Sequence, residues 1–302
     1  MQILQNLDYI PNLTLALGFF DGVHIAHQKL IKKSVNFAHE NKSKSAVITL
    51  KQQPYCYLNN IEPKFISQRT ESYQTIENLG VDYLIELNFD DVMQLTALEY
   101  LQNILIKNFE PIGIFTGFNH HFGHNRKGNC VFLEKYQSEF NYHFEALPSQ
   151  TLNGNLISSS AIRKFLEQGQ IKDANSMLGR EFCVNGTVVE GNKIGRTMNF
   201  PTANIIYPKD IIEIPNGVYE AEVELADGRK IKSIANFGKK PTVNNTNKKT
   251  LETHILNNFN ENIYGQNIKI YFSKFIRAER KFGNIEELKE QIKNDISDIK
   301  CQ

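Results

Sequence analysis

The sequence predicts a two-domain protein that joins an α/β domain to an all-β domain. The chain has 302 residues, which favours two domains at roughly 100–200 residues each. Strand-like and helix-like segments alternate in the first half, as in βαβ units around a parallel sheet. After Arg180, apolar residues recur with a period of two, as in half-buried antiparallel strands. We therefore expect a parallel-sheet domain over residues 1–180 and a small antiparallel β-barrel with a terminal helix over residues 181–302.

The elements of the first domain follow from short apolar runs and the residues that end them. A β-rich run such as Ala46 to Leu50 predicts a strand that is buried on both faces. Strands are expected over residues 14–17, 46–50, 81–87, 112–115 and 143–147, and helices over residues 27–40, 70–79, 96–107 and 129–140. Ligands of parallel sheets bind beyond the carboxyl ends of the strands, so the candidate binding loops follow Leu17, Leu50 and Phe115.

The second domain shows alternating strands, a tight turn and a closing helix. The segment 218–225 places Tyr219 and Val223 on one face and glutamates on the other, and Asp227-Gly228 after it predicts a hairpin turn. Residues 268–273 alternate in the same way. The closing helix is amphipathic and has a cap at Asn284 with Glu287; its apolar face consists of Ile285, Leu288, Ile292 and Ile296.

Composition excludes several classes of function. Lys and Arg total 34 against 33 Asp and Glu, so there is no basic excess for nucleic-acid binding. No apolar run approaches the ~18 residues of a membrane helix, and the start lacks the basic flank of a signal peptide. The four cysteines are far apart and predict free thiols in a reducing cytoplasm. We expect a cytoplasmic protein with small-molecule ligands and leave its oligomeric state open.

A phosphate site is predicted between the first strand and the first helix. His24 and His27 are three residues apart at the helix start, so both imidazoles point the same way. The helix N-terminus adds free amides and a positive dipole end, while Gly18 and Gly22 allow the backbone to approach a ligand. A metal pair or a structural cap is the alternative, although no carboxylate or cysteine stands nearby at metal-ligand spacing.

This segment is similar to the G-x-F-D-x-x-H-x-G-H signature of the adenylyltransferase half of bacterial riboflavin kinase/FAD synthetase. The resemblance implies a Rossmann-like nucleotidyltransferase domain. In it, His24 and His27 would be catalytic residues that contact the phosphates of ATP. It also implies an ATP-binding role for four residues of the loop, namely Gly18, Phe20, Asp21 and Gly22. Two positions depart from the family: Ala26 replaces a glycine, and Lys51-Gln52-Gln53-Pro54 stands where relatives have Pro-His-Pro.

Two further segments of the first domain resemble the same family. Residues 116–123 match G-x-[DN]-x-x-F-G, which implies that Asn119 contacts the flavin substrate; a solvated loop or an adventitious metal-binding histidine cluster remains open. Ser158, Ser159 and Arg163 match I-S-S-[ST]-x-I-R, which implies phosphate-binding serines and a catalytic arginine. Without the family order, serine is also a common helix cap.

The second domain carries a segment similar to the riboflavin kinase signature G-R-x-x-x-F-P-T-A-N. The resemblance implies that Gly195 and Arg196 bind ATP and that Thr202 and Asn204 bind ATP with Mg²⁺, although the segment alone could be only a turn. Asn199 replaces a family glycine.

Two charged residues of the second domain complete the predicted site. Glu252 lies in an apolar strand pattern, where a partly buried carboxylate suits a general base; a structural Lys–Glu pair is the alternative. The family has its catalytic glutamate in a similar L-E-x-H stretch. Arg277, in a stretch resembling R-x-E-x-K-F, is expected to contact flavin or phosphate, or equally to form a salt bridge.

The resemblance covers nearly the whole chain, with its motifs in the family's order. It implies phosphorylation of riboflavin to FMN by the second domain with ATP and Mg²⁺. The first domain would then join FMN to AMP from a second ATP, giving FAD and pyrophosphate. Two alternatives stay open: a kinase with an impaired adenylyltransferase half, or a non-catalytic flavin or nucleotide sensor.

Overall fold

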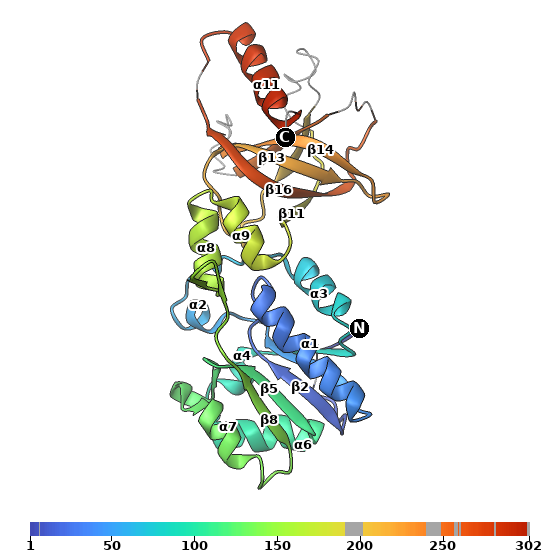
Figure 1. Ribbon diagram of the computed structural model, residues 1–302, viewed down its shortest axis with the longest axis vertical. Helices are drawn as coiled ribbons and strands as arrows, with labels where there is room; N and C mark the ends of the chain where they lie inside the picture. The colour runs from blue at the N-terminus through green and yellow to red at the C-terminus, as the bar shows by residue number, and fades with distance from the viewer. Residues whose placement is uncertain are drawn as a thin grey trace. The chain divides into compact units, whose positions relative to one another are not determined.

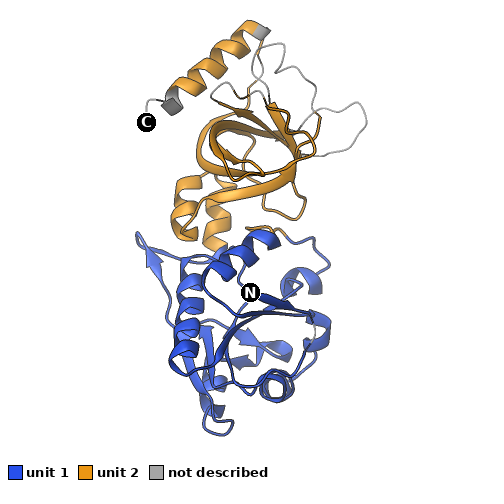
Figure 2. Ribbon diagram, turned by 90° about the vertical axis from the view of Figure 1, so that its right-hand side faces the viewer, with its two compact units in different colours: residues 1–63, 69–159 blue, residues 64–68, 160–302 orange. Residues whose placement is uncertain are grey.

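The computed structural model describes residues 1–5, 7–190, 202–239, 249–256, 259, 261–280 and 282–300. The chain forms two compact units, coloured separately in Figure 2. The N-terminal unit comprises residues 1–63 and 69–159, and the C-terminal unit comprises residues 64–68 and 160–302. The segment between 160 and 180 therefore packs within the C-terminal unit, while the domain boundary at 180/181 stays a prediction.

The N-terminal unit is built on a six-stranded sheet in the order β1-β4-β3-β2-β5-β8. Every pairing in it is parallel, which confirms the predicted Rossmann-like sheet. The strands are β1 (Gln2–Leu4), β2 (Leu13–Leu17), β3 (Lys44–Leu50), β4 (Tyr83–Leu87), β5 (Gly113–Gly117) and β8 (His143–Leu147). The chain leaves β2 toward β3 on one side and later returns to β5 on the other, so the ligand crevice of this topology lies beyond the ends of β2 and β5.

Helices cover both faces of this sheet (Figure 1). On one face, α1 (Ile25–Glu40) and α3 (Arg69–Asn78) pack apolar side chains such as Ile31 and Ile76 against Val47 and Leu84. On the other face lie α7 (Cys130–Tyr136) and a continuous helical run formed by α5 (Ala97–Glu99), the π-helix η1 (Tyr100–Ile106) and α6 (Lys107–Phe109). The short elements are α2 (Pro54–Leu58), α4 (Phe89–Val92), β6 (His121–Phe122), η2 (His124–Arg126), β7 (Gly128–Asn129), β9 (Thr151–Leu152) and β10 (Asn155–Leu156).

The C-terminal unit is an antiparallel barrel preceded by α8 (Ser159–Glu167) and α9 (Ile171–Leu178). Its strands run in the order β11-β16-β13-β14-β15-β12. They span β11 (Phe182–Thr187), β12 (Thr202–Ile206), β13 (Gly217–Glu224), β14 (Lys230–Lys239), β15 (Lys249–Ile255) and β16 (Asn267–Ala278). The Val189 amide donates to the Asn204 carbonyl at 2.8 Å, and this bridge joins the two ends of the sheet. The predicted barrel is therefore confirmed (Figure 2).

The barrel interior and the closing helix follow the predicted patterns. Large side chains from alternate positions fill the interior, among them Tyr219, Phe237 and Phe272. The predicted turn closes the hairpin of β13 and β14, with the Leu225 amide donating to the Arg229 carbonyl at 2.9 Å. The helix α11 (Ile285–Lys300) is capped as predicted, since Asn284 Oδ1 accepts from the Glu287 amide at 2.9 Å. None of the described helices is long and apolar enough to cross a membrane.

Candidate active sites

The loop after β2 presents the two predicted histidines at the start of α1. His24 is the N-cap of the helix, and its Nδ1 accepts a hydrogen bond from the His27 amide at 3.3 Å. The imidazole rings are stacked, with centroids 3.6 Å apart and 16° between their planes. The edge of the Phe20 ring meets His27 with the centroids 5.2 Å apart. The structure therefore brings together the side chains that the sequence placed at the phosphate site.

The protonation of His27 is controlled by its surroundings. Burial, and then the charge of His24, hold the pKa of His27 well below its ordinary value of 6.5. Its Nδ1 is buried and has no hydrogen-bond partner among the described residues. A neutral imidazole with an unsatisfied nitrogen can donate to, or accept from, a ligand. His24 therefore acts as a structural cap of α1, while the unsatisfied nitrogen of His27 at the same helix start supports a ligand site.

The backbone of this loop is strained. Phe20, Gly22 and Val23 all have positive φ angles, of 53°, 75° and 37° respectively. A positive φ is unusual for the β-branched Val23, and such strain is concentrated at functional sites. A Cβ at Gly18 would lie 2.8 Å from the Phe20 ring, so this glycine is required by packing within the loop itself. The backbone conformation and packing supply reasons for Gly18 and Gly22 that the sequence motif did not reveal.

The predicted serines lie beside the same loop, and Arg163 belongs to the other unit. Ser159 Oγ donates to the Asp21 carbonyl at 2.9 Å, a contact within the N-terminal unit, which ends at this serine. Ser158 is half-buried and Asp21 is buried. Arg163 lies on α8 in the C-terminal unit, where its Nε donates to the Lys64 carbonyl at 3.3 Å.

Asn119 is exposed in the loop after β5, at the predicted edge of the sheet. Its carbonyl accepts a hydrogen bond from His121 Nδ1 at 2.8 Å. The neighbouring His120 has a buried, unpartnered Nε2, and burial followed by the charges of His121 and Arg126 lowers its pKa to about 4. In the part of the chain that the structure describes, no group of three or more His, Cys, Asp and Glu side chains is placed to hold a metal ion.

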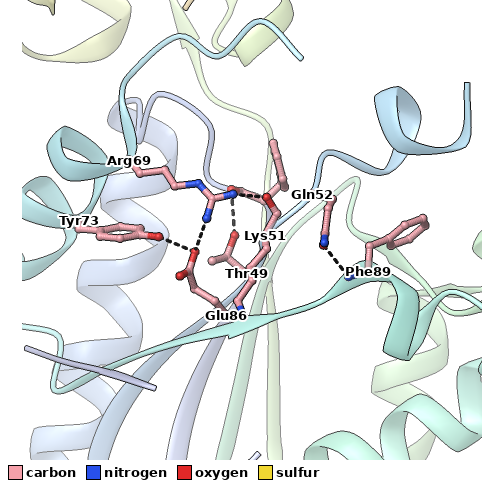
Figure 3. Close-up of polar contacts among 8 residues, drawn as sticks. Thr49, Lys51, Gln52, Arg69, Tyr73, Glu86 and Phe89 are labelled. Atoms are coloured by element: carbon pink, nitrogen blue, oxygen red, sulfur yellow. Dashed lines mark hydrogen bonds and ion pairs between the residues drawn. The ribbon is translucent and has the colours of Figure 1, made fainter. Parts of the chain in front are cut away.

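A network that sequence reasoning missed holds the loop after β3 (Figure 3). Arg69 reaches the buried Glu86 carboxylate at 3.4 Å and also donates to the Lys51 carbonyl. The Tyr73 hydroxyl donates to the same carboxylate, and burial followed by this bond raises the pKa of Tyr73 to about 12. These residues come from α3, β4 and the loop, so no local pattern could have indicated their contact.

The two glutamines that replace the family's Pro-His-Pro pattern have structural partners. Gln52 Oε1 accepts from the Phe89 amide at 2.8 Å, as Figure 3 shows, and Gln53 Oε1 accepts from Cys56 Sγ at 3.0 Å. Thr49 Oγ1, at the end of β3, donates to the Phe19 carbonyl at 3.1 Å. The loops after β2 and β3 are thus linked at the edge of the sheet where the histidines lie.

The barrel brings three predicted kinase residues together. Glu252 on β15 lies directly opposite Asn204 on β12, and Thr202 is two residues before Asn204. The Asn204 amide nitrogen lies 3.4 Å from Thr202 Oγ1, and Asn204 is only 4% exposed. Residues that pair across antiparallel strands point to the same face, so these side chains share one face of the barrel. Gly195 and Arg196, also predicted here, lie outside the described residues.

Arg277 has a protein partner. Its guanidinium donates to both oxygens of the buried Asp295 carboxylate of α11, from Nε to Oδ1 at 3.0 Å and to Oδ2 at 3.1 Å, and from Nη2 to Oδ2 at 2.8 Å. Gln291 donates to the same carboxylate at 2.7 Å. Of the two roles that the sequence left open, the structure shows a salt bridge, and the flavin contact stays a prediction.

A parallel α/β unit with stacked histidines at a helix start, joined to a barrel with a Thr-Asn-Glu face, defines a two-unit enzyme of phosphoryl and nucleotidyl transfer. Residues 8–161 match the family model described as FAD synthetase, and residues 178–301 match the one described as riboflavin kinase. The chain belongs to the bifunctional riboflavin kinase/FMN adenylyltransferase family, which confirms the family predicted from the sequence.

Relatives of this family match along nearly their whole length. The bifunctional riboflavin kinase/FMN adenylyltransferase of Buchnera aphidicola subsp. Acyrthosiphon pisum is 35% identical over 302 residues, which cover 98% of this chain and 96% of the relative. The enzyme of the same name from Haemophilus influenzae is 33% identical, with 100% and 99% covered. A solved structure from Streptococcus pneumoniae, described as a macrolide-efflux protein, has a TM-score of 0.88 and 29% identity over 98% of this chain and 97% of that chain. The fold of both units is therefore shared with a protein of known structure.

Proposed function

We propose that this chain phosphorylates riboflavin to FMN in its C-terminal unit and adenylylates FMN to FAD in its N-terminal unit, using ATP for both steps. The observation that supports the proposal is that each unit brings candidate reactive side chains of its own close together. The stacked pair His24 and His27 belongs to one unit, and the opposed pair Glu252 and Asn204 belongs to the other. The free thiols Cys56 and Cys130 support our proposal of a cytoplasmic location.

In the kinase step, Glu252 accepts the proton of the riboflavin 5′-hydroxyl. The hydroxyl oxygen forms a bond to the γ-phosphorus of ATP, and the bond to ADP breaks. Thr202 and Asn204 offer a hydroxyl and an amide oxygen on the same barrel face as the base. Mg²⁺ prefers oxygen ligands and takes only one or two of them from the protein beside substrate phosphates, so these two oxygens would help to hold it. When bound, Mg²⁺ neutralises the charge on the phosphates, while the chain's own residues orient the hydroxyl and remove its proton.

In the adenylyl step, a phosphate oxygen of FMN attacks the α-phosphorus of the second ATP, and pyrophosphate leaves. The nucleophile is already anionic, so no strong base is required. The free amides at the start of α1 and the imidazoles of His24 and His27 face the phosphates and stabilise the developing charge. We propose a supporting role in this step for the serines 158 and 159 and a flavin contact for Asn119. The phosphate role predicted for Arg163, which lies in the C-terminal unit, stays a prediction.

Chromatography of the products from riboflavin, ATP and Mg²⁺ tests the proposal. We expect FMN followed by FAD; FMN alone indicates an impaired adenylyltransferase half, and no product indicates a sensor. Glu252→Gln should lower FMN formation by ~10²–10⁴-fold, the usual contribution of a general base. The same variant should still convert supplied FMN to FAD, because that chemistry belongs to the other unit. Near-normal phosphorylation by Glu252→Gln would remove the assignment of the base.

A further inference from the structure

Glu252 has an asparagine neighbour on each side. It pairs with Asn204 on β12 and, across its other edge, with Asn236 on β14. Paired positions of antiparallel strands present their side chains to the same face, with Cβ atoms about 4.5–5.5 Å apart. The three side chains therefore form one row, Asn204–Glu252–Asn236, with the proposed base at its centre.

This row is on the outer face of the barrel. The flanking residues on each strand belong to the opposite face, and Ala235, Phe237 and Leu251 there are completely buried in the barrel interior. Asn204 and Glu252 already form part of the proposed kinase site. Asn236 therefore shares the face on which the phosphoryl acceptor must lie, although neither the sequence motifs nor the proposed reaction gives it a role.

The carboxamide of Asn236 has an unsatisfied oxygen. Its Oδ1 is buried and has no hydrogen-bond partner among the described residues. Buried polar atoms without partners are rare in proteins, and each requires an explanation. A carboxamide oxygen is an acceptor, so the missing partner must be a donor such as a hydroxyl group.

We propose that Asn236 is a substrate-contacting residue, whose Oδ1 accepts a hydrogen bond from an internal hydroxyl of the ribityl chain of the flavin. The inference rests on the proposed kinase function of this barrel. Glu252 binds the terminal hydroxyl of the ribityl chain. The strand β14, which carries Asn236, lies about 4.8 Å from the strand of Glu252. A polyol carries further hydroxyls along its length, so one of them reaches Asn236 when the terminal one is at Glu252. Asn236 thus selects a hydroxylated chain over an apolar one.

The test compares two flavins that differ only in the internal hydroxyls. Riboflavin is one, and a flavin with a 5-hydroxypentyl chain, which keeps only the terminal hydroxyl, is the other. The native full-length protein should prefer riboflavin in kcat/KM. Asn236→Ala should lower this preference on the order of 10- to 100-fold, as expected for one hydrogen bond to a buried group. Its kcat/KM for the 5-hydroxypentyl flavin should change little, because that substrate never made the contact.

Asn185→Ala is the matched control. Asn185 is also a barrel asparagine with a buried, unpartnered Oδ1, but it lies on β11 opposite Lys269 and outside the row. The Asn185→Ala variant should leave the preference between the two flavins unchanged. Comparison with Asn236→Ala then separates the general effect of removing a buried carboxamide from the loss of a contact with substrate. Thermal melting of both variants identifies any that fail to fold.

A conservative variant supplies the second readout. Asn236→Asp keeps an acceptor oxygen and should retain most of the preference for riboflavin. An unchanged preference in a folded Asn236→Ala overturns the inference, as does an equal loss on both flavins or an effect only on the Mg²⁺ requirement. If the native protein makes no FMN, the proposed function itself fails, which is a different result.

Discussion

The ring centroids of His27 and His24 lie 3.6 Å apart in a stacked pair, and Nδ1 of His27 is buried without a hydrogen-bond partner among the described residues. Burial, and then the charge of His24, keep the pKa of His27 well below 6.5, so the ring is neutral in the free protein near neutral pH. A bound phosphate reverses this balance, because a nearby anion favours the charged imidazole.

The first prediction is therefore that nucleotide binding raises the pKa of His27. Titration of the histidine ring signals by NMR should give a midpoint below 6.5 in the free protein and a higher one with a non-hydrolysable ATP analogue. The His27→Gln variant assigns the signal. An identical midpoint with and without the analogue would show that the imidazole does not face the phosphates.

The second prediction concerns how much each of the two histidines contributes to the rate of adenylyl transfer. His24→Ala and His27→Ala should each lower FAD formation from FMN and ATP by ~10²–10³-fold, the usual cost of one preorganised donor to developing charge. Asn at either position should retain more activity than Ala, since an amide still donates a hydrogen bond. Riboflavin phosphorylation by the same variants is the internal control and should not change. Normal FAD synthesis in both alanine variants would rule out the assigned roles.

The sequence predicted the layers of the fold because periodicity is a local property. The apolar run from Ala46 to Leu50 indicates a strand buried on both faces, and the alternation of Tyr219 with Glu220 indicates a strand buried on one face. Both segments are strands in the structure. The strand β11 was missed because Asn185 and Gly186, which have low β propensity, interrupt its apolar pattern. Its place in the barrel depends on pairing with β16, which is distant in sequence.

The site was predictable only where a motif is contiguous. The loop carrying His24 and His27 could be identified from its spacing, but its positive φ angles could not. The pairing of Glu252 with Asn204 depends on which strands become neighbours, and the Arg69–Glu86 contact joins residues 17 apart in sequence. Tertiary packing decides which of these residues become neighbours, so the local patterns of a single sequence do not indicate the pairs.

The third prediction is that Asp295 anchors the terminal helix. Its side chain is 3% exposed and that of Arg277 is 21% exposed, so Asp295→Ala leaves a largely buried cation without its partner. We expect the free energy of unfolding of the C-terminal unit to fall by about 3–5 kcal/mol. Asp227→Ala is the control, because its pair with Arg229 is half exposed on both sides and should matter little. Urea unfolding measures the free energy of unfolding of both variants. Equal stability of Asp295→Ala and Asp227→Ala would contradict the anchoring role of Asp295.

The fourth prediction concerns the length of the fragment that folds. Asn175 on α9 donates to the Phe272 carbonyl and accepts from the Phe182 amide, each at 2.8 Å. Met177 and Leu178 of the same helix are buried. A fragment of residues 160–302 should therefore melt about 5–10 °C above one of residues 181–302, since two hydrogen bonds and their packing are kept. Circular dichroism melting measures the difference, and Asn175→Ala in the longer fragment should remove part of it. Equal melting temperatures would support an independent domain that begins at 181.

The last prediction concerns Ala26, which replaces a family glycine between the two histidines. Ala26 is half-buried in the first turn of α1, and the rings of His24 and His27 on either side of it are stacked. We therefore expect the loop to accommodate the methyl group. We expect Ala26→Gly to leave FAD formation and the KM for ATP within about twofold. The glycine adds backbone freedom to the unfolded chain, so stability should fall by roughly 0.5–1 kcal/mol. The measurement is FAD formation from FMN and ATP, with riboflavin phosphorylation as the control. If the methyl instead crowds a phosphate, Ala26→Gly will raise adenylyl transfer while phosphorylation stays constant, and the adapted loop is then the wrong explanation.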